Sequence, residues 1–501
     1  AYGYNLSSMG CEVTAAVATV LMAFFFLPKY LAGAFTTLPE FLSARFDEGV
    51  RRMTLVLFML GYGLVTIPSV LYSGSIAVLK LFDLPELLQL DYSTSLVLTI
   101  MVIGAMGASY AILGGLRAVA VSDTLNGVGL LIVGVAVPWL GLRALGEGSV
   151  GSCLNMVLTT ETQKLNAIGG PTDPTPFATL FTGMVFANLF YWCTNQYVIQ
   201  RTLAARSLAE GQKGVLLSGF FKVLVPLLMM IPGVVAYHLY GPELQSIDLA
   251  YPQLVRDVLP VYATGFFLAV LLGAVLSSFN SLINSASTLF CIDVYQPLVG
   301  RAVSDAEMVR VAKRVGLVMT GFSLLVAPLL QFAAEGLWQV IRIFTGFYNI
   351  PMIAIVIIGL FTRQVPAVAA KVVIVFHIIA YCTFQFVLKD LLPVHFLHLY
   401  AILFVVEVAM MLAIGVWCPR GQETAIRQTA ELDLTPWAYA QPCAVTLLSC
   451  VLALYVVFSP IGLVGDGSNL FAPVLLGLLG LNGAFWFGWH RRLTAGSGSH
   501  A

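Results

Sequence analysis

The chain has 501 residues, of which 59% are hydrophobic and only 10% charged, and its net charge is zero. Soluble domains carry roughly 25% charged residues, so these proportions exclude an ordinary soluble protein, and no nucleic-acid partner is expected. Apolar runs of about 20 residues, enough to cross a bilayer core about 30 Å thick, recur along the whole sequence. The composition therefore predicts an all-α polytopic membrane protein in contact with the lipid bilayer.

Thirteen such runs predict thirteen transmembrane helices, and the basic residues orient them. Of the Lys and Arg residues in the connections and helix ends, seventeen fall on one side and five on the other. The positive-inside rule then places the C-terminus in the cytoplasm and residue 1 outside. Since this count is odd and residue 1 is not Met, upstream helices are expected to be absent from the chain. The predicted spans are 8–28, 54–82, 94–114, 120–144, 176–198, 213–239, 259–294, 310–333, 337–361, 366–388, 395–417, 437–459 and 469–489.

The first half of the chain carries two acidic residues of interest and one long outer loop. Glu12 lies near the outer end of its span, where it suits either a helix start or a functional site. Asp123 follows GGLRAVAVS at the cytoplasmic end of its span, and its position fits a helix-capping acid and a cation contact equally well. The loop at 146–175 contains GGPTDPTP, whose Pro and Gly residues disfavour regular structure.

The segment FANLFYWCTNQYVIQR (186–201) concentrates amides and large aromatic rings in one predicted span. Asn188, Tyr191 and Trp192 are the residue types that hold sugars, because ring faces stack on sugar C–H groups while amides pair with hydroxyls. An aromatic belt at the membrane interface explains the same composition equally well. Asn188 lies too deep in the span for that belt.

Two basic residues fall within later spans. Lys222 lies about ten residues into the span 213–239, and a charge near mid-membrane costs at least ~3 kcal/mol on insertion scales, which favours a functional role. Arg342 lies nearer the outer end of its span, where its side chain can also extend to the membrane surface.

The stretch LSSFNSLINSAST (276–288) is a polar stripe within an otherwise apolar span. On a helix, Ser277, Ser281, Asn284 and Thr288 share one face, and Ser278 lies beside it. Neutral oxygen ligands of this kind suit a small monovalent cation. They also join neighbouring helices by hydrogen bonds, and the spacing alone leaves the two interpretations level.

Sequence motifs argue against an enzyme or an ATP-driven pump. The chain contains no G-x-x-x-x-G-K-[ST] phosphate-binding loop, and neither H-E-x-x-H nor G-x-S-x-G occurs in or near a span. We therefore expect a protein that acts on what crosses the membrane, with no enzymatic activity.

Several long motifs resemble the sodium:solute symporter family, within its sodium/glucose cotransporter branch. They are TLPEFLSARF (37–46), GGLRAVAVSDTLNG (114–127), YWCTNQYVIQRTLAARS (191–207) and SSFNSLINSASTLF (277–290). The segments CEVTAAV, GGPTDP and YWCTNQ are similar to those of YidK-type bacterial symporters, a group with no established substrate.

The resemblance implies an inverted five-helix repeat, the LeuT-like transporter fold, and alternating access driven by sodium. Residues 1–145 would form the first repeat without its first core helix, and 146–175 an outer loop. Residues 176–361 would form the second repeat, and 362–501 additional C-terminal helices.

The resemblance also assigns roles to individual residues. Asp123 would be a transient sodium contact on the way out, and the main sodium ligands would be Ala274, Ser277 and Ser278. Thr66 and Ala15 replace an asparagine and a serine of the branch, and Arg342 replaces a glutamine. Arg342 would favour a carboxylate or phosphate on the solute. The solute contacts would be Glu12, Thr66, Asn188, Tyr191, Trp192, Lys222, Ser281 and Arg342.

The function so implied is sodium-coupled import of a sugar or sugar-like solute across the bacterial cytoplasmic (inner) membrane by a multi-pass symporter. Its partners would be the solute, Na⁺ and the bilayer. Two alternatives stay open, which are a symporter for an anionic sugar acid or other organic solute, and a sensor or channel that no longer couples transport.

Overall fold

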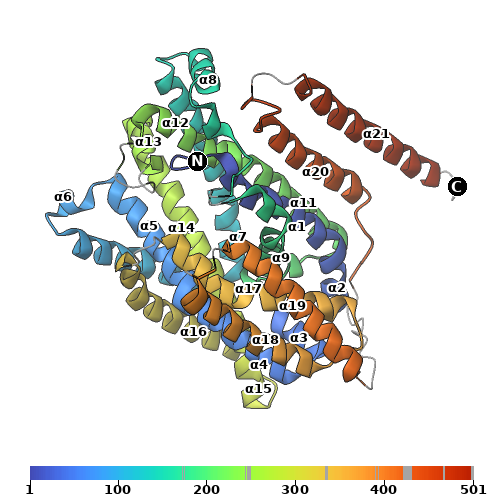
Figure 1. Ribbon diagram of the computed structural model, residues 1–501. Coiled ribbons are helices and arrows are strands. Elements are labelled where there is room, and N and C mark those ends of the chain that lie inside the picture. Colours follow the sequence, from blue (N-terminus) through green and yellow to red (C-terminus); the bar gives the residue numbers. More distant parts are fainter. Residues whose placement is uncertain are drawn as a thin grey trace.

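The computed structural model is a bundle of helices, and no strand occurs in its described residues (Figure 1). The structure describes residues 1–171, 173, 175–242, 244, 247, 250–332, 337–389, 391–392, 394–420, 432–465 and 469–497. Within these ranges, the side chains at 111–120, 337–340, 342 and 496–497 are not described.

The first 160 residues form eight helices. These are α1 (Met9–Leu21), α2 (Leu27–Ala32), α3 (Leu38–Arg45), α4 (Glu48–Gly61), α5 (Ile67–Leu81), α6 (Leu84–Leu88), α7 (Tyr92–Leu145) and α8 (Val150–Thr159).

The middle of the chain contributes the helices that carry most of the predicted site. These are α9 (Gly183–Cys193), α10 (Gln196–Leu203), α11 (Leu208–Val225), α12 (Ile231–Tyr240), α13 (Ala250–Val258), α14 (Val261–Phe290) and α15 (Gln296–Val299).

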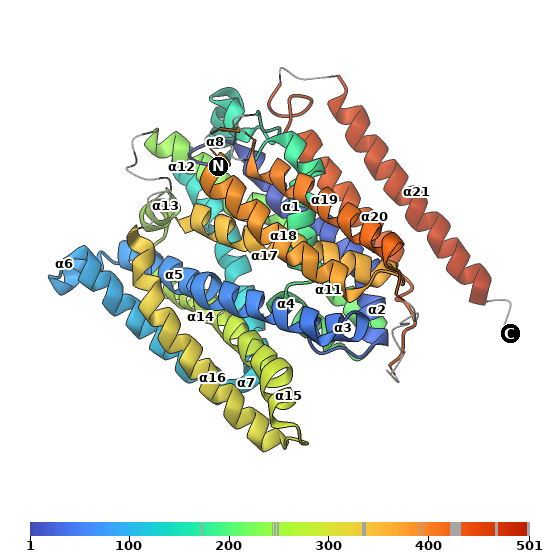
Figure 2. The ribbon, with the colours of Figure 1, turned by 60° about the horizontal axis from the view of Figure 1, so that its bottom comes forward.

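The remaining helices complete the bundle, and α20 and α21 lie along one edge of it (Figures 1 and 2). These are α16 (Asp305–Val326), α17 (Leu337–Phe361), α18 (Ala367–Thr383), α19 (Phe396–Trp417), α20 (Ala440–Val457) and α21 (Phe471–Ser497).

In the described part of the chain, twelve helical segments are long and apolar enough to span a membrane. π-helical turns join α1 to α2 at Met22–Phe26 and α4 to α5 at Tyr62–Thr66, so each pair forms one continuous span. Such turns widen a helix locally and are frequent at functional sites. Each of the thirteen predicted spans except 176–198 overlaps one of these twelve segments.

The predicted span 176–198 is a broken helix instead of a continuous one. α9 ends at Cys193, Asn195 is extended with φ −72° and ψ 117°, and α10 begins at the next residue. The Thr194 hydroxyl donates to the Phe190 carbonyl at 2.7 Å, and such polar side chains compete with the helical backbone pattern. Both Thr194 and Asn195 are buried, as irregular backbone at membrane depth must be.

The long helix α7 doubles back between Gly107 and Asn126. A straight helix of 54 residues would be about 80 Å long. A Cβ on Gly107 would touch Phe279, whereas the Asn126 side chain donates to the Gly273 carbonyl at 3.0 Å, so two distant parts of α7 meet neighbouring turns of α14. α7 therefore supplies two spans, as predicted from 94–114 and 120–144.

A fully buried arginine holds the end of α17 in place. The Arg45 side chain, 1% exposed, donates to the carbonyls of Gly359, Thr362 and Val365 at 3.1, 3.0 and 3.3 Å. A cation suits the negative end of a helix dipole. Burial, together with the charge of Arg420, lowers the pKa of Arg45 to about 10, so the side chain stays charged at neutral pH.

Candidate functional site

Glu12 and Lys222 form an ion pair between α1 and α11. The Lys222 Nζ donates to the Glu12 Oε2 at 2.5 Å, and the two side chains are 27% (Glu12) and 26% (Lys222) exposed. The same Nζ lies 5.4 Å from the centre of the Trp192 ring on α9, within cation–π range. Three predicted solute contacts from separate helices therefore meet at one place.

Asn188 anchors α9 to α1 beside this pair. Its amide donates to the Thr14 hydroxyl at 2.7 Å and to the Cys11 carbonyl at 3.2 Å. Cys11 and Thr14 flank Glu12 along α1. Asn188 thus borders the Glu12–Lys222 pair, but in this arrangement its donors are used by the protein.

Tyr191 is 38% exposed and belongs to a chain of aromatic hydroxyls. Its ring lies 5.7 Å from that of Trp192, and the Tyr197 hydroxyl donates to the Tyr191 hydroxyl at 2.6 Å. The Tyr62 ring packs edge-on against Tyr197 at 6.0 Å, and its hydroxyl donates to the Asn195 Oδ1 at 2.7 Å. An exposed ring with fixed neighbours can stack on a solute without first being ordered.

The other predicted solute positions lie in different surroundings. Thr66 lies in the π-helical turn, where its hydroxyl donates to the Gly61 carbonyl at 3.1 Å. Ala15 is buried one turn beyond Glu12. Arg342 belongs to α17, but its side chain lies outside the described residues.

Ser277 and Asp123 meet in a second polar cluster, between α14 and the second half of α7. The Ser277 hydroxyl donates to Asp123 Oδ1 in a short hydrogen bond. The Arg201 guanidinium of α10 pairs with Asp123 Oδ2 and donates to the Ser281 hydroxyl at 2.7 Å. Two of the four residues predicted to contact sodium are therefore in contact with each other, and an arginine of the same chain neutralises the acid.

The other two residues predicted to contact sodium, Ser278 and Ala274, lie on the same helix. Ser278 is exposed and Ala274 half-buried. The polar stripe continues along α14 to α10, where Gln200 accepts from Ser285 at 2.6 Å and donates to Thr288 at 3.1 Å. This lower part of the stripe joins two helices by hydrogen bonds.

Sequence reasoning missed the contribution of α10 to this cluster. In the sequence Arg201 contributes only to the excess of basic residues on one side of the membrane, and nothing local to Gln200 marks it as a partner of another helix. Both lie within the quoted motif YWCTNQYVIQR, where an amide next to an arginine follows a polar break. That arrangement could have indicated a polar site, but only the tertiary structure shows that its partner is α14.

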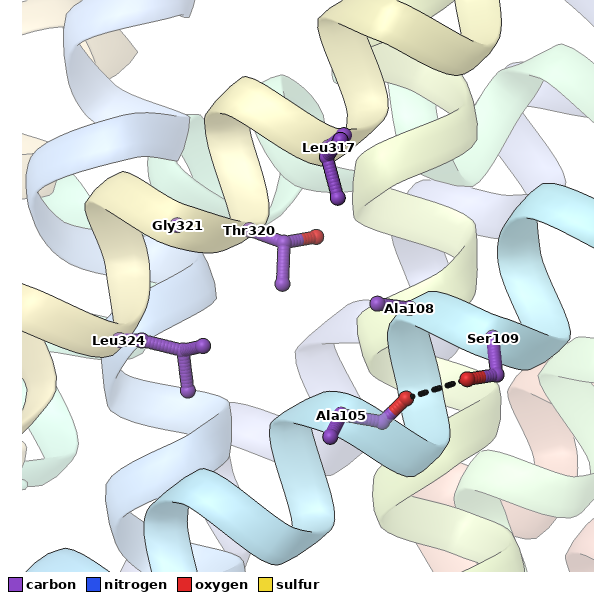
Figure 3. A pocket seen from close by; sticks show the side chains of 7 residues that line it. All are labelled: Ala105, Ala108, Ser109, Leu317, Thr320, Gly321 and Leu324. Atoms are coloured by element: carbon purple, nitrogen blue, oxygen red, sulfur yellow. Dashed lines mark hydrogen bonds between the residues drawn. The ribbon is translucent and has the colours of Figure 1, made fainter.

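A separate groove lies between α7 and α16, and its lining includes no residue of either cluster. It has a volume of about 620 Å³ and is lined by small and apolar side chains (Figure 3). Its serine, Ser109, donates to its own helix at the Ala105 carbonyl, at 2.8 Å. Ala105, Ser109, Leu317 and Gly321 are exposed, as expected for a face turned to lipid. The groove offers a polar solute few partners.

Comparison with known proteins places these features in a family. The model of the "Sodium:solute symporter family" matches residues 1–373. The "Uncharacterized symporter YidK" of Escherichia coli is 41% identical over 474 residues, which cover 95% of this chain and 82% of that protein. The "Sodium/glucose cotransporter" of Vibrio parahaemolyticus is 28% identical over 403 residues, which cover 75% of this chain and 71% of that protein.

A solved structure of a Na⁺-coupled sialic acid symporter, in its substrate-bound outward-open state, shares the fold. It superposes with a TM-score of 0.72 at 21% identity and covers 84% of this chain and 86% of that one. The predicted LeuT-like transporter fold is thereby confirmed. Sodium is the coupling ion, and the partners are a solute, sodium and the membrane. The chain belongs to the sodium:solute symporter family and is a multi-pass, sodium-coupled membrane symporter.

Proposed function

We propose that the protein imports a sugar or sugar-like solute with sodium by alternating access, with the solute bound between α1, α9 and α11. The observation that carries this proposal is the Glu12–Lys222 pair at 2.5 Å beside Trp192. The carboxylate can accept hydrogen bonds from the hydroxyls of a solute, and the ammonium group can donate hydrogen bonds to them. Asn188 and Tyr191 supplement this set, and we also assign solute contacts to Thr66 and, in the cluster of α14 with Arg201, to Ser281.

Sodium supplies enough free energy for such uptake. One charge crossing ~100 mV releases about 2.3 kcal/mol, and a tenfold concentration gradient adds about 1.4 kcal/mol. Together these correspond to roughly 500-fold accumulation of solute per ion.

We infer that sodium binds at Ala274, Ser277 and Ser278 and contacts Asp123 on its way to the cytoplasm. In the present arrangement Arg201 pairs with Asp123 and hydrogen-bonds Ser281. A sodium ion near Asp123 would share that carboxylate with a guanidinium. The ion therefore competes with Arg201, and the arginine replaces it as it leaves.

The repeats proposed for this mechanism are residues 1–145 and 176–361, with the loop 146–175 between them and the helices of 362–501 outside them. The break between α9 and α10 supports the second repeat, since transporter sites of this kind form at interrupted helices. The excess of Lys and Arg in alternate connections supports a cytoplasmic C-terminus in the inner membrane.

A second candidate solute is an anionic sugar acid. Lys222 provides one cation at the proposed site, and Arg342 is a second one on α17 by sequence. The sodium/glucose relative favours a neutral sugar, so we place the sugar acid second.

The test is uptake by proteoliposomes containing the full-length protein, with labelled hexoses, polyols and hexuronates and with or without an inward sodium gradient. We expect sodium-dependent accumulation of a neutral sugar or polyol. Accumulation of hexuronates alone would select the second candidate, and Arg342→Gln would then reverse the preference. Uptake without sodium dependence would indicate a leak and overturn coupled transport.

A further inference from the structure

A histidine and a glutamate lie together in the middle of the membrane, apart from both clusters described above. His377 on α18 and Glu407 on α19 have completely buried side chains, and their Nδ1 and Oε1 atoms are 2.5 Å apart. His377 is eleventh in the 22-residue span Ala367–Leu388 and Glu407 twelfth in the 22-residue span Phe396–Trp417. Each is thus about 16 Å from the ends of its span.

The hydrogen bonds fix how many protons the pair holds. The His377 Nε2 lies 2.9 Å from the Gly346 carbonyl of α17, which only accepts, so Nε2 carries a hydrogen. Nδ1 and the Glu407 Oε1 are then joined by one further proton, because two lone pairs at 2.5 Å would repel. Either the imidazolium faces a carboxylate or the neutral ring faces a carboxylic acid, and the pair is neutral in both forms.

The same pair would hold fewer protons if it were separated in water. There, above about pH 6.5, the glutamate is ionised and the histidine is mostly neutral. The packed arrangement therefore binds about one more proton than the separated groups do at neutral or alkaline pH. Any change of structure that opens the pair to water releases that proton.

The pair also fastens α17, which the neighbouring tyrosine contacts as well. The Tyr381 ring stacks on His377 at 5.6 Å, and its hydroxyl donates to the Ile343 carbonyl at 3.1 Å. A Cβ at Gly346 would overlap the hydroxyl oxygens of Tyr381 and Tyr400, so the glycine permits this close approach. α18 thus holds two carbonyls of α17, one through His377 and one through Tyr381, and His377 in turn is held by Glu407 of α19.

The surroundings of the pair contain no second charge that replaces the proton among the described side chains. The second oxygen of Glu407 is buried with no hydrogen-bond partner among them. Lys371, which pairs with Asp47, lies six residues before His377, about 9 Å along α18. α9 carries no Asp, Glu, Lys or Arg, and the charged residues of α4 lie in its first turns. The other ionisable residues of these elements are His398, Tyr381, Tyr400, Cys382, Tyr348, Tyr191, Cys193 and, with its side chain undescribed, Arg342; His398 lies in the first turn of α19 and contacts Thr182.

This region is connected to the helix that carries Arg201. Phe186 of α9 stacks on Phe404 of α19 with ring centres 3.8 Å apart, and Phe404 precedes Glu407 by one helical turn. α9 leads through the break at Thr194 and Asn195 into α10. The arrangement that closes the His377–Glu407 pair is also the one in which Arg201 engages Asp123.

We propose that His377 and Glu407 form a proton-binding site that stabilises this arrangement of α17, α18 and α19 and so opposes sodium binding. The ligand is a single proton, taken up as the pair closes and released to water as it opens. The site lies outside the proposed solute site, and the proposal rests on the sodium contact proposed at Asp123 but not on the solute being a sugar. Because protonation favours the arrangement in which Arg201 occupies Asp123, sodium affinity rises with pH.

The test is binding of ²²Na⁺ to the purified full-length protein between about pH 6 and pH 9, with no solute present. We expect the apparent sodium affinity of the unmodified protein to rise with pH, by at most about tenfold per pH unit for one proton. In Glu407→Gln the amide donates to Nδ1 and preserves the contact without a shared proton. Its sodium affinity is therefore expected to vary less with pH.

The matched control is Tyr381→Phe, which removes a neighbouring bond to α17 but neither member of the His377–Glu407 pair, and should keep the unmodified pH profile. An unchanged profile in Glu407→Gln, or an affinity that falls as pH rises, would overturn the proposal.

A second measurement needs no variant. Sodium chloride added to the weakly buffered, unmodified protein at about pH 8 should release up to one proton per molecule, whereas choline chloride should release none. Absence of release would also overturn the proposal.

Discussion

The Glu12–Lys222 and His377–Glu407 pairs both lie inside membrane-length helices, but they differ in access. The first pair is about a quarter exposed, whereas the second is sealed on both sides. An accessible pair can exchange one partner for a solute. A sealed pair can exchange only a proton, which passes where no solute fits. We therefore expect the two pairs to respond to different ligands, the accessible one to a solute and the sealed one to a proton.

Among substitutions that remove one member of either pair, the largest expected effect is a loss of stability. His377→Ala leaves the Glu407 carboxyl inside the protein without its partner, and removing one member of a buried pair costs about 3–5 kcal/mol. Lys222→Ala leaves a glutamate that solvent reaches, so the loss should be clearly smaller. Melting temperatures of the two purified variants in detergent measure the difference, and equal losses would show that exposure does not distinguish the pairs.

The accessible pair should instead control uptake. Lys222→Gln removes the charge that holds Glu12 and is expected to lower uptake at low solute concentration on the order of 100-fold, which corresponds to about 2.7 kcal/mol. Sodium binding should stay nearly unchanged. Lys213→Gln is the control, because Lys213 lies on the same helix but pairs with Glu210 at the surface. Comparable losses in both variants would remove Lys222 from the site.

The cluster on α14 offers a third site for comparison. Asp123→Asn removes the negative charge that Ser277 and Arg201 contact and should weaken sodium binding by roughly tenfold, or about 1.4 kcal/mol. Asp91→Asn changes the capping residue at the start of the same helix and should have no effect on ²²Na⁺ binding. A sodium affinity unaltered by Asp123→Asn would contradict the proposed contact.

Arg201→Gln should change sodium affinity in the opposite direction. The glutamine can still donate to Ser281, but it no longer competes with sodium for Asp123. We expect roughly three- to tenfold tighter sodium binding, or about 0.7–1.4 kcal/mol. Arg206→Gln, an exposed residue nearby, serves as control. Weaker binding in Arg201→Gln would mean that the arginine holds the sodium ligands in position.

The smallest expected effect is at Ala15. Ala15→Ser adds a hydroxyl one turn from Glu12, and one new hydrogen bond is worth about 0.5–1.5 kcal/mol. Affinity for a hydroxylated solute should rise about two- to tenfold in competition assays. Val17→Thr adds a hydroxyl on the opposite face of α1 and should not change it. Equal gains at both positions would argue against a contact at Ala15.

Most of the membrane spans could be predicted from the sequence, because a span requires a run of about 20 apolar residues that is visible locally. The polar stripe of α14 was also visible, since Ser277, Ser281 and Thr288 repeat at helical spacing. The approach of Glu12 to Lys222 was not, because 210 residues separate them. Only the family resemblance joined them before the structure did.

Two features could not be predicted from the sequence, for different physical reasons. The break at Thr194 and Asn195 lies in an apolar run, and average hydropathy does not detect two polar residues that end a helix. His377 and Glu407 are isolated ionisable residues in apolar spans, and nothing local to either shows that it has a partner on the next helix. Tertiary packing decides both features.

The break between α9 and α10 also bears on how tightly the movement of sodium is coupled to the movement of solute. Asn188, Tyr191 and Trp192 lie on one side of the joint, and Gln200 and Arg201 on the other. In the proposed mechanism the solute contacts α9 and the sodium ion displaces Arg201 on α10, so this joint connects the two binding events. We therefore expect a more flexible joint, as in Thr194→Gly, to let α9 and α10 move independently, so that sodium would cross the membrane without solute.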